Sequence, residues 1–136
     1  MNFLLKVLLL CFLCIPLSYG DDISKWNEQS LTEWVDKYPT STINGKRKSI
    51  LSEEYIKTIL QKTIPPAELK KLNKYDVVTP IEKIDHYLIV NKCMAPNCPA
   101  ELAMVVIGLK APVIWVGFFE REEIKKMFLS RHGVGI

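Results

Sequence analysis

The sequence predicts an α+β protein in which helices pack against an antiparallel β-sheet meander. Three apolar runs in the second half are rich in the β-branched and aromatic residues that favour strands. The connections between them, 93–98 and 110–112, are far shorter than the dozen or so residues that a parallel crossover needs. The first half instead places its apolar residues at helical spacing. Helices gathered before and after an antiparallel sheet define the α+β class.

Residues 1–20 have the pattern of a secretory signal peptide. Lys6 gives a positively charged start, 7–15 form an apolar run, and Ser18 and Gly20 supply small residues before a cleavage site. The run is shorter than the roughly 20 apolar residues of a membrane span. We therefore expect a single domain over residues 21–136, periplasmic or secreted and with no membrane anchor after cleavage.

The net charge of the mature chain limits the classes of partner that we expect, and its cysteine count predicts a disulfide. Removing Lys6 leaves 17 of the 18 Lys and Arg residues against 15 Asp and Glu, a net charge of +2. Nucleic-acid binding requires a clustered basic face, so no nucleic-acid partner is expected. Cleavage also removes two of the four cysteines. Because exported proteins with an even number of cysteines favour disulfides, Cys93 and Cys98 are expected to pair.

The first helix is predicted over residues 24–38. Its apolar residues recur at helical spacing, Ser24 or Ser30 supplies the cap, and Pro39 ends it. The polar segment 40–48 is expected to be a loop.

Two further helices are predicted before the sheet. Ser52 is a good N-cap for the first of them, which carries one apolar stripe and stops at Pro65, where the hydrogen-bond ladder cannot continue. Pro66 suits the first position of a short helix over 67–72.

The remaining chain is predicted to form strands and a closing helix. A short strand over 75–79 precedes strands over 84–90, 102–109 and 113–119. The second of these three is nearly all apolar, as in a central strand buried on both faces. Residues 120–131 are expected to form a helix, because acidic residues come first and basic residues later, as the helix dipole favours.

The residues give little support to an enzyme, and we expect none. No motif for a zinc protease, a phosphate-binding loop or a calcium loop is present. Cys93 and Cys98 are four residues apart rather than two, which disfavours thiol–disulfide exchange. His86 and His132 are most simply a partly exposed histidine and a cation at a helix end. No metal site and no cofactor are expected.

A binding module fits the residues better than an enzyme does. A rigid loop on a sheet loses little entropy on association, and such loops often carry recognition. The disulfide and a proline would stiffen the loop between the two cysteines. The expected binding residues are Met94, Ala95, Pro96 and Asn97, held by Cys93 and Cys98. From the residues alone, a hairpin turn without a partner is an equally good interpretation.

The loop and the elements around it resemble the Ivy family, the bacterial periplasmic inhibitors of vertebrate lysozyme. That family shows the patterns L-P-x-W-V, T-P-x-x-x-V-x-x-x-x-x-Y and C-K-P-H-D-C, followed by an apolar strand and an aliphatic-Gly-aromatic strand. The resemblance covers about residues 55–119. The matching segments are Ile64-Pro65-Pro66-Ala67-Glu68-Leu69, Thr79-Pro80-Ile81-Glu82-Lys83-Ile84-Asp85-His86-Tyr87, Cys93-Met94-Ala95-Pro96-Asn97-Cys98, Leu102 to Ile107 and Val116-Gly117-Phe118-Phe119.

The resemblance implies an antiparallel sheet with helices, and inhibition through the loop. In the family, a histidine between the cysteines enters the lysozyme cleft and contacts the catalytic carboxylates. This chain departs there, because Pro96 stands at the position of the histidine and Asn97 at that of the following aspartate. Asn97 can still donate an amide N–H.

The expected function is therefore a secreted or periplasmic protein-binding module that inhibits a lysozyme or another peptidoglycan-lytic enzyme. Two alternatives are an immunity protein for a cell-wall-degrading toxin and a structural or chaperone-like periplasmic protein without an inhibitory loop. The apolar strand run would also leave an exposed edge, which allows two copies to pair as a homodimer.

Overall fold

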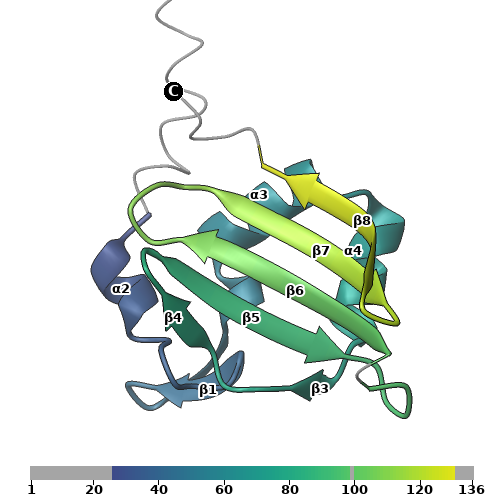
Figure 1. Cartoon of the computed structure of the whole chain (residues 1–136). Helices are drawn as coiled ribbons and strands as arrows, with labels where there is room; N and C mark the ends of the chain where they lie inside the picture. Colours follow the sequence, from purple (N-terminus) through teal and green to yellow (C-terminus); the bar gives the residue numbers. More distant parts are fainter. Residues whose placement is uncertain (1–25, 99, 131–136) are drawn as a thin grey trace, which may run out of the picture.

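The computed structural model describes residues 26–98 and 100–130 and shows an antiparallel sheet with helices packed behind it (Figure 1). The predicted α+β class with an antiparallel meander is confirmed. The strands follow the order β3 (Val77–Val78), β5 (Tyr87–Cys93), β6 (Glu101–Gly108), β7 (Ile114–Glu120) and β8 (Glu123–Leu129), with β4 (Glu82–Ile84) also paired to β5. The predicted signal peptide, 1–20, lies outside the described residues.

The first helix, α2 (Glu28–Thr32), is much shorter than the predicted 24–38. The Asn27 side chain caps it by accepting hydrogen bonds from two backbone N–H groups of the first turn, and Ser24 lies outside the described residues. The helix ends early because the next segment pairs with the chain before β4. The Asp36 N–H donates to the Ile81 carbonyl at 2.8 Å, and Asp36 has a positive φ of 66°.

The segment predicted as a loop over 40–48 is a β-hairpin. Strands β1 (Thr40–Ile43) and β2 (Lys46–Ser49) pair antiparallel around Asn44 and Gly45. Both turn residues have positive φ, 51° and 78°, which is the geometry that makes Asn-Gly the preferred hairpin dipeptide. The expectation of a loop was wrong because β1 and β2 are almost entirely polar and lack the apolar alternation that marks a strand.

Two helices follow the 3₁₀ turn η1 (Ile50–Ser52): α3 (Glu54–Thr63) and α4 (Pro66–Lys74). The buried stripe of α3 is confirmed, whereas Ser52 is not the cap, since it lies inside η1. Pro66 begins α4, as predicted. The two helices cover one face of the sheet (Figure 1).

The predicted strands 75–79 and 84–90 are divided differently in the structure. Strand β3 (Val77–Val78) is short, and β4 (Glu82–Ile84) forms a hairpin with β5 (Tyr87–Cys93). The chain reverses at Asp85, whose φ is 53°. Pro80 has no N–H to donate, which fits the break between the two edge strands β3 and β4.

The other strands are β6 (Glu101–Gly108), β7 (Ile114–Glu120) and β8 (Glu123–Leu129). The predicted closing helix over 120–131 is wrong, because β8 pairs with β7 after a two-residue turn. Arg121 and Glu122 both have positive φ there, 52° and 68°. Pairing with the otherwise free edge of β7 outweighs a helical pattern only three turns long.

The core lies between the sheet and the helices. The side chains of Ala103, Val105 and Ile107 on β6 are fully buried on this side. Leu102, Met104 and Val106, which alternate with them, are only half-buried. The prediction that this strand is buried on both faces is therefore wrong, since helices cover one face only. The main core residues are Leu31, Trp34, Ile50, Ile56, Ile59, Leu60, Leu72, Tyr75, Ile81, Leu88, Val90, Ile114, Val116 and Phe118.

Candidate binding surfaces

The cysteine loop, residues Cys93–Cys98, projects beyond the sheet at the corner where β5 leads to β6 (Figure 1). The Cα atoms of Cys93 and Cys98 are 5.5 Å apart and their sulfur atoms lie at bonding distance. Inside this pair, the Met94 N–H donates to the Glu101 carbonyl at 3.1 Å, and the Glu101 N–H donates to the Asn97 carbonyl at 2.9 Å. The loop is therefore held at both ends.

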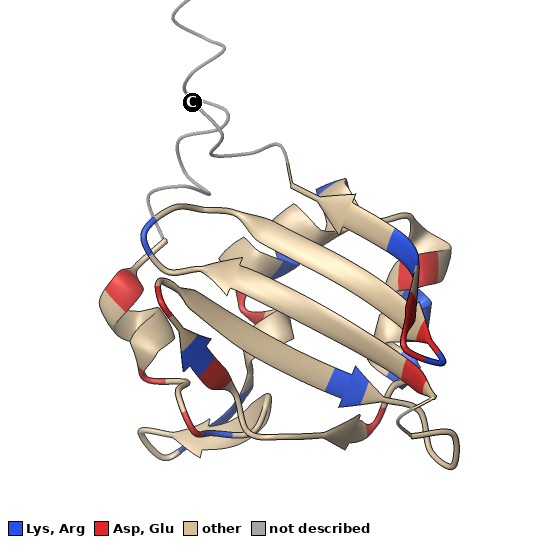
Figure 2. Ribbon diagram, in the orientation of Figure 1, with Lys and Arg blue, Asp and Glu red and all other residues tan. Residues whose placement is uncertain are grey.

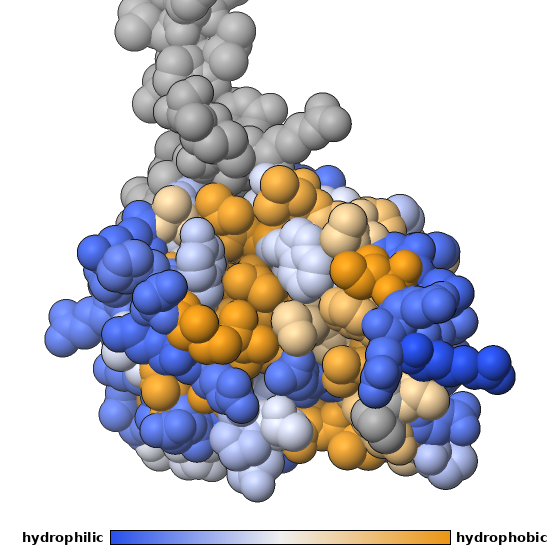
Figure 3. Space-filling view, in the orientation of Figure 1, coloured by the Kyte–Doolittle hydropathy of each residue, from blue (hydrophilic) through white to orange (hydrophobic). Residues whose placement is uncertain are grey.

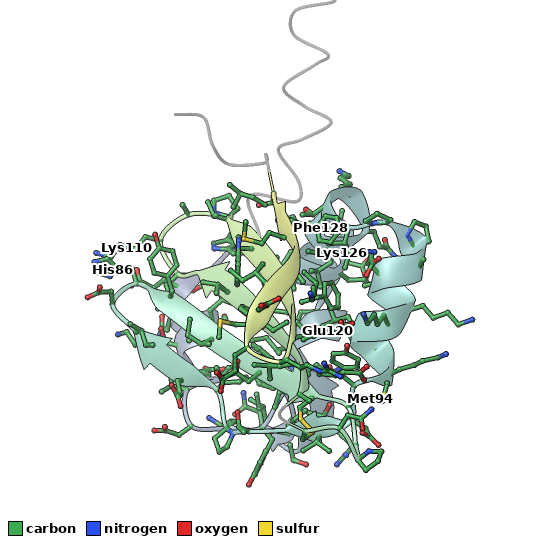
Figure 4. All side chains as sticks on the ribbon, turned by 45° about the vertical axis from the view of Figure 1, so that its right-hand side comes forward. His86, Met94, Lys110, Glu120, Lys126 and Phe128 are labelled. Carbon is green, nitrogen blue, oxygen red and sulfur yellow. A yellow bond between two sulfur atoms is a disulfide. The ribbon has the colours of Figure 1, made fainter. Side chains whose placement is uncertain are left out.

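Three of the four predicted binding residues are exposed. Ala95, Pro96 and Asn97 are exposed to solvent, and the Ala95–Pro96 peptide bond is cis. Met94 instead packs against the hydrophobic core and is half-buried (Figure 4). It serves as an anchor for the loop, so any partner would meet the short segment 95–97 first.

A row of three glutamates crosses the sheet beside the loop. Glu101 lies directly opposite Glu120, which lies opposite Glu123 on β8. Like charges in directly opposite positions destabilise a sheet. The groove next to them is also lined by Asn97, and it includes the cations Arg121 and Lys125. The Lys125 ammonium lies 3.3 Å from a Glu123 carboxylate oxygen, which offsets part of the repulsion.

The row also affects the buried Tyr75, which packs edge-on against Phe118 at 6.3 Å between ring centroids. Burial raises the pKa of Tyr75 above its ordinary value, and the negative charges of Glu101 and Glu120 raise it further. The two carboxylates therefore disfavour ionisation of the Tyr75 phenol.

The face of the sheet that no described helix covers is apolar, and we call it the open face (Figure 3). Side chains from six strands, β3 to β8, point to it, because residues paired across neighbouring strands share a face. Several are more than half exposed, including Met127 and Leu129 at 58 %. Its members, one of which is the exposed carboxylate of Glu82, are Val77, Glu82, Ile84, Tyr87, Ile89, Asn91, Leu102, Met104, Val106, Trp115, Gly117, Phe119, Ile124, Met127 and Leu129.

Trp115 lies flat against this face because Gly117 has no side chain. A Cβ atom added at Gly117 would come within 2.4 Å of the indole Cη2 atom of Trp115. The ring also contacts Phe119 edge-on, with centroids 6.4 Å apart. The glycine therefore lets the largest side chain of the open face lie along the strand.

Metal ligands and histidines offer few further candidate sites among the described residues. Within residues 26–98 and 100–130, no group of three or more His, Cys, Asp or Glu side chains could hold a metal ion. His86 is exposed in the turn between β4 and β5, at the other end of the sheet from the cysteine loop (Figure 4). The predicted helix-end cation His132 lies outside the described residues. In the described part of the chain, no helix is long and apolar enough to cross a membrane.

Comparison of the chain with protein-family models, with curated proteins and with solved structures finds no match. The resemblance to the Ivy family thus rests on the quoted segments and stays a prediction.

The open face was not predicted from the sequence. Strands β6 and β7 carry apolar residues at both alternating sets of positions, so periodicity alone does not reveal that one face lacks a cover. The signal that could have revealed it is on β8, where apolar Ile124, Met127 and Leu129 fall on one side of an edge strand.

Proposed function

We propose that this protein is an exported protein-binding module that inhibits a lysozyme or another peptidoglycan-lytic enzyme through its cysteine loop. The observation that carries the proposal is the exposure of Ala95, Pro96 and Asn97 on a loop held at both ends. A loop fixed before binding avoids much of the ordering cost of association. The resemblance of the loop and its flanking strands to the Ivy family supports this choice of target.

The exposed segment suits a narrow cleft lined by carboxylates. Most enzymes that hydrolyse glycosidic bonds place two carboxyl groups on either side of the bond. The Asn97 side chain can donate an amide N–H to such a group, whereas Pro96 contributes shape and rigidity without a donor. The glutamate row beside the loop favours a partner whose cleft has a basic rim.

An immunity role against a cell-wall-degrading toxin would use the same surface. It differs from inhibition of a host lysozyme only in the identity of the enzyme. Both forms of the proposal make the same prediction for substitutions in the loop.

The proposal is tested by titrating the protein against a c-type lysozyme and against bacterial peptidoglycan hydrolases, with cell-wall hydrolysis as the readout. We expect one of these enzymes to be inhibited. The double variant P96A/N97A should raise the inhibition constant at least tenfold, since hot-spot side chains commonly contribute more than about 1.4 kcal/mol.

Arg47→Ala is a matched control, because Arg47 is exposed on the β1–β2 hairpin, away from the loop. It should leave the inhibition constant unchanged. Absence of inhibition of every enzyme tested would contradict the proposed function, and an inhibition constant that P96A/N97A does not change would show that another surface binds.

A further inference from the structure

We propose that the open face is the interface of a homodimer, in which two copies pack their sheets face to face. The cysteine loop lies at a corner of the sheet and takes no part in this interface. Large apolar side chains are exposed on the open face. Ile84, Tyr87, Ile124, Met127 and Leu129 are each between 46 % and 58 % exposed, although all five belong to one face.

The area of the open face is that of a stable interface. The five strands β4 to β8 lie roughly 4.8 Å apart, and strands of seven residues rise about 3.3 Å per residue, so the footprint is on the order of 20 Å by 20 Å. Specific interfaces bury roughly 800 Å² of accessible surface on each partner. A rough surface of this footprint supplies that order of area, whereas monomeric proteins rarely expose apolar patches beyond a few hundred Å².

The shape of the face favours a second sheet over a single helix. A helix with its side chains is roughly 10–12 Å wide, so one helix would cover about half of the footprint. A second copy of the sheet matches the full width, as in β-sandwiches, whose sheets pack about 10 Å apart. Trp115 lies along its strand over Gly117, which keeps the centre of the face low enough for such packing.

Charges of both signs lie at each end of the sheet. His86 and Lys110 lie at one end, beside Asp85, and Glu120 lies towards the other (Figure 4). The β7–β8 hairpin carries Arg121 as well as acidic residues (Figure 2). A two-fold axis lying across the strands would place each end over the opposite end of the partner, and with both signs at each end the charges do not oppose this arrangement.

The test is sedimentation velocity of the purified protein over a range of concentrations. We expect a dimer in the wild type. Met127→Lys and Leu129→Lys should each raise the dimer dissociation constant at least tenfold, because they place a charge in the interface. Both side chains are mostly exposed in the single copy, so the fold should survive, as circular dichroism would show. Tyr38→Lys is the matched control, since Tyr38 is 53 % exposed but lies outside the open face.

Tryptophan fluorescence gives a second readout on the same samples. Trp115 is half-buried on the open face, so dilution of the dimer should shift its emission to longer wavelength, and Trp115→Phe should remove the shift. A wild type that stays monomeric, or a Met127→Lys variant that dimerises as tightly as the wild type, would overturn the proposal. A monomer whose emission shifts only on addition of phosphatidylglycerol vesicles would also overturn it and assign the face to a lipid surface.

Discussion

The pair Trp115 and Gly117 shows how one residue sets the shape of a surface. A glycine within a strand normally costs stability, because it loses more backbone freedom and packs no side chain. Here the indole of Trp115 fills the space above Gly117 and recovers apolar contact. The cost of the glycine is thus offset by the ring that covers it.

Gly117→Ala is therefore expected to destabilise the protein. The added methyl group needs the space that the Trp115 ring occupies, and overpacking of this kind costs roughly 1–3 kcal/mol. Chemical denaturation measures the change. In a Trp115→Leu background the same substitution should be neutral or stabilising, because the obstacle is gone. Equal destabilisation in both backgrounds would show that the ring and the glycine are not coupled.

Tyr55 should make stability depend on pH in the alkaline range. Its ring packs edge-on against Trp26, with centroids 5.6 Å apart. Burial and, to a lesser extent, Glu53 raise the pKa of Tyr55 from 10.0 to about 12. The folded state therefore favours the neutral phenol. This contribution is complete below about pH 10 and is lost as the pH rises towards about 12.

Urea unfolding at about pH 9 and about pH 11 tests this dependence. The wild type should lose stability between the two, and Tyr55→Phe should lose less. Tyr75 acts with the same sign as Tyr55, since its pKa is also raised. Lys92 acts with the opposite sign, because burial lowers its pKa. Identical pH profiles for the wild type and Tyr55→Phe would contradict the assignment.

At the scale of elements, α4 is tied to the edge strand β8 by a partly buried ion pair. Glu68 of α4 is buried, and one of its carboxylate oxygens accepts a hydrogen bond from the Lys126 ammonium (Figure 4). Its other oxygen is buried without a hydrogen-bond partner in the described structure. Helix α4 also contacts β7, where the Lys71 ammonium lies 5.4 Å from the centroid of the Phe118 ring. The position of β8 therefore depends on this ion pair, because removing the Lys126 ammonium would leave the buried Glu68 carboxylate without a cation.

Lys126→Met should destabilise the protein by roughly 1–2 kcal/mol, because it leaves the buried Glu68 carboxylate without a cation. The double variant E68Q/K126M should be less destabilised than K126M alone, since the unpaired charge is gone. Denaturation midpoints of the wild type, the two single variants E68Q and K126M, and the double variant measure the coupling. Additive losses in the double variant would show that the two side chains do not interact.

The elements were predicted correctly where local signals agreed with tertiary packing. Pro65 and Pro66 mark the boundary between α3 and α4, and the β6 and β7 runs are strands as expected. Several of the errors lie at hairpins, whereas the early end of α2 does not. The reversals at Asp85 and at Arg121-Glu122 use positive φ on residues other than glycine or asparagine, which composition does not reveal. The predicted closing helix failed there, because pairing with β7 decides the conformation of β8.

At the scale of the whole molecule, the fold class could be predicted from the short connections between strands. Whether one or both faces of the sheet are covered could not be predicted from them. Short loops between apolar runs require antiparallel neighbours, so the meander was predictable. The number of layers depends on whether a cover exists for each face, and the apolar patterns of β6 and β7 do not encode that. The cysteine loop was found from its spacing alone, but its orientation, with Met94 inward and 95–97 outward, required the packed structure.

The two proposed binding surfaces lie on different parts of the molecule. The open face would join two copies, and the cysteine loop at the sheet corner would stay free to enter a target. A dimer of this kind presents two loops, so a target with repeated sites would be bound with added avidity.

The most direct test of the inhibitory role is the ratio of two inhibition constants, for P96A/N97A and for the wild type, against the lytic enzyme that the protein inhibits. We predict a ratio of at least ten, because the loop is the inserted element. The ratio for Arg47→Ala should be close to one. A ratio close to one for P96A/N97A as well would contradict the claim that the cysteine loop carries inhibition.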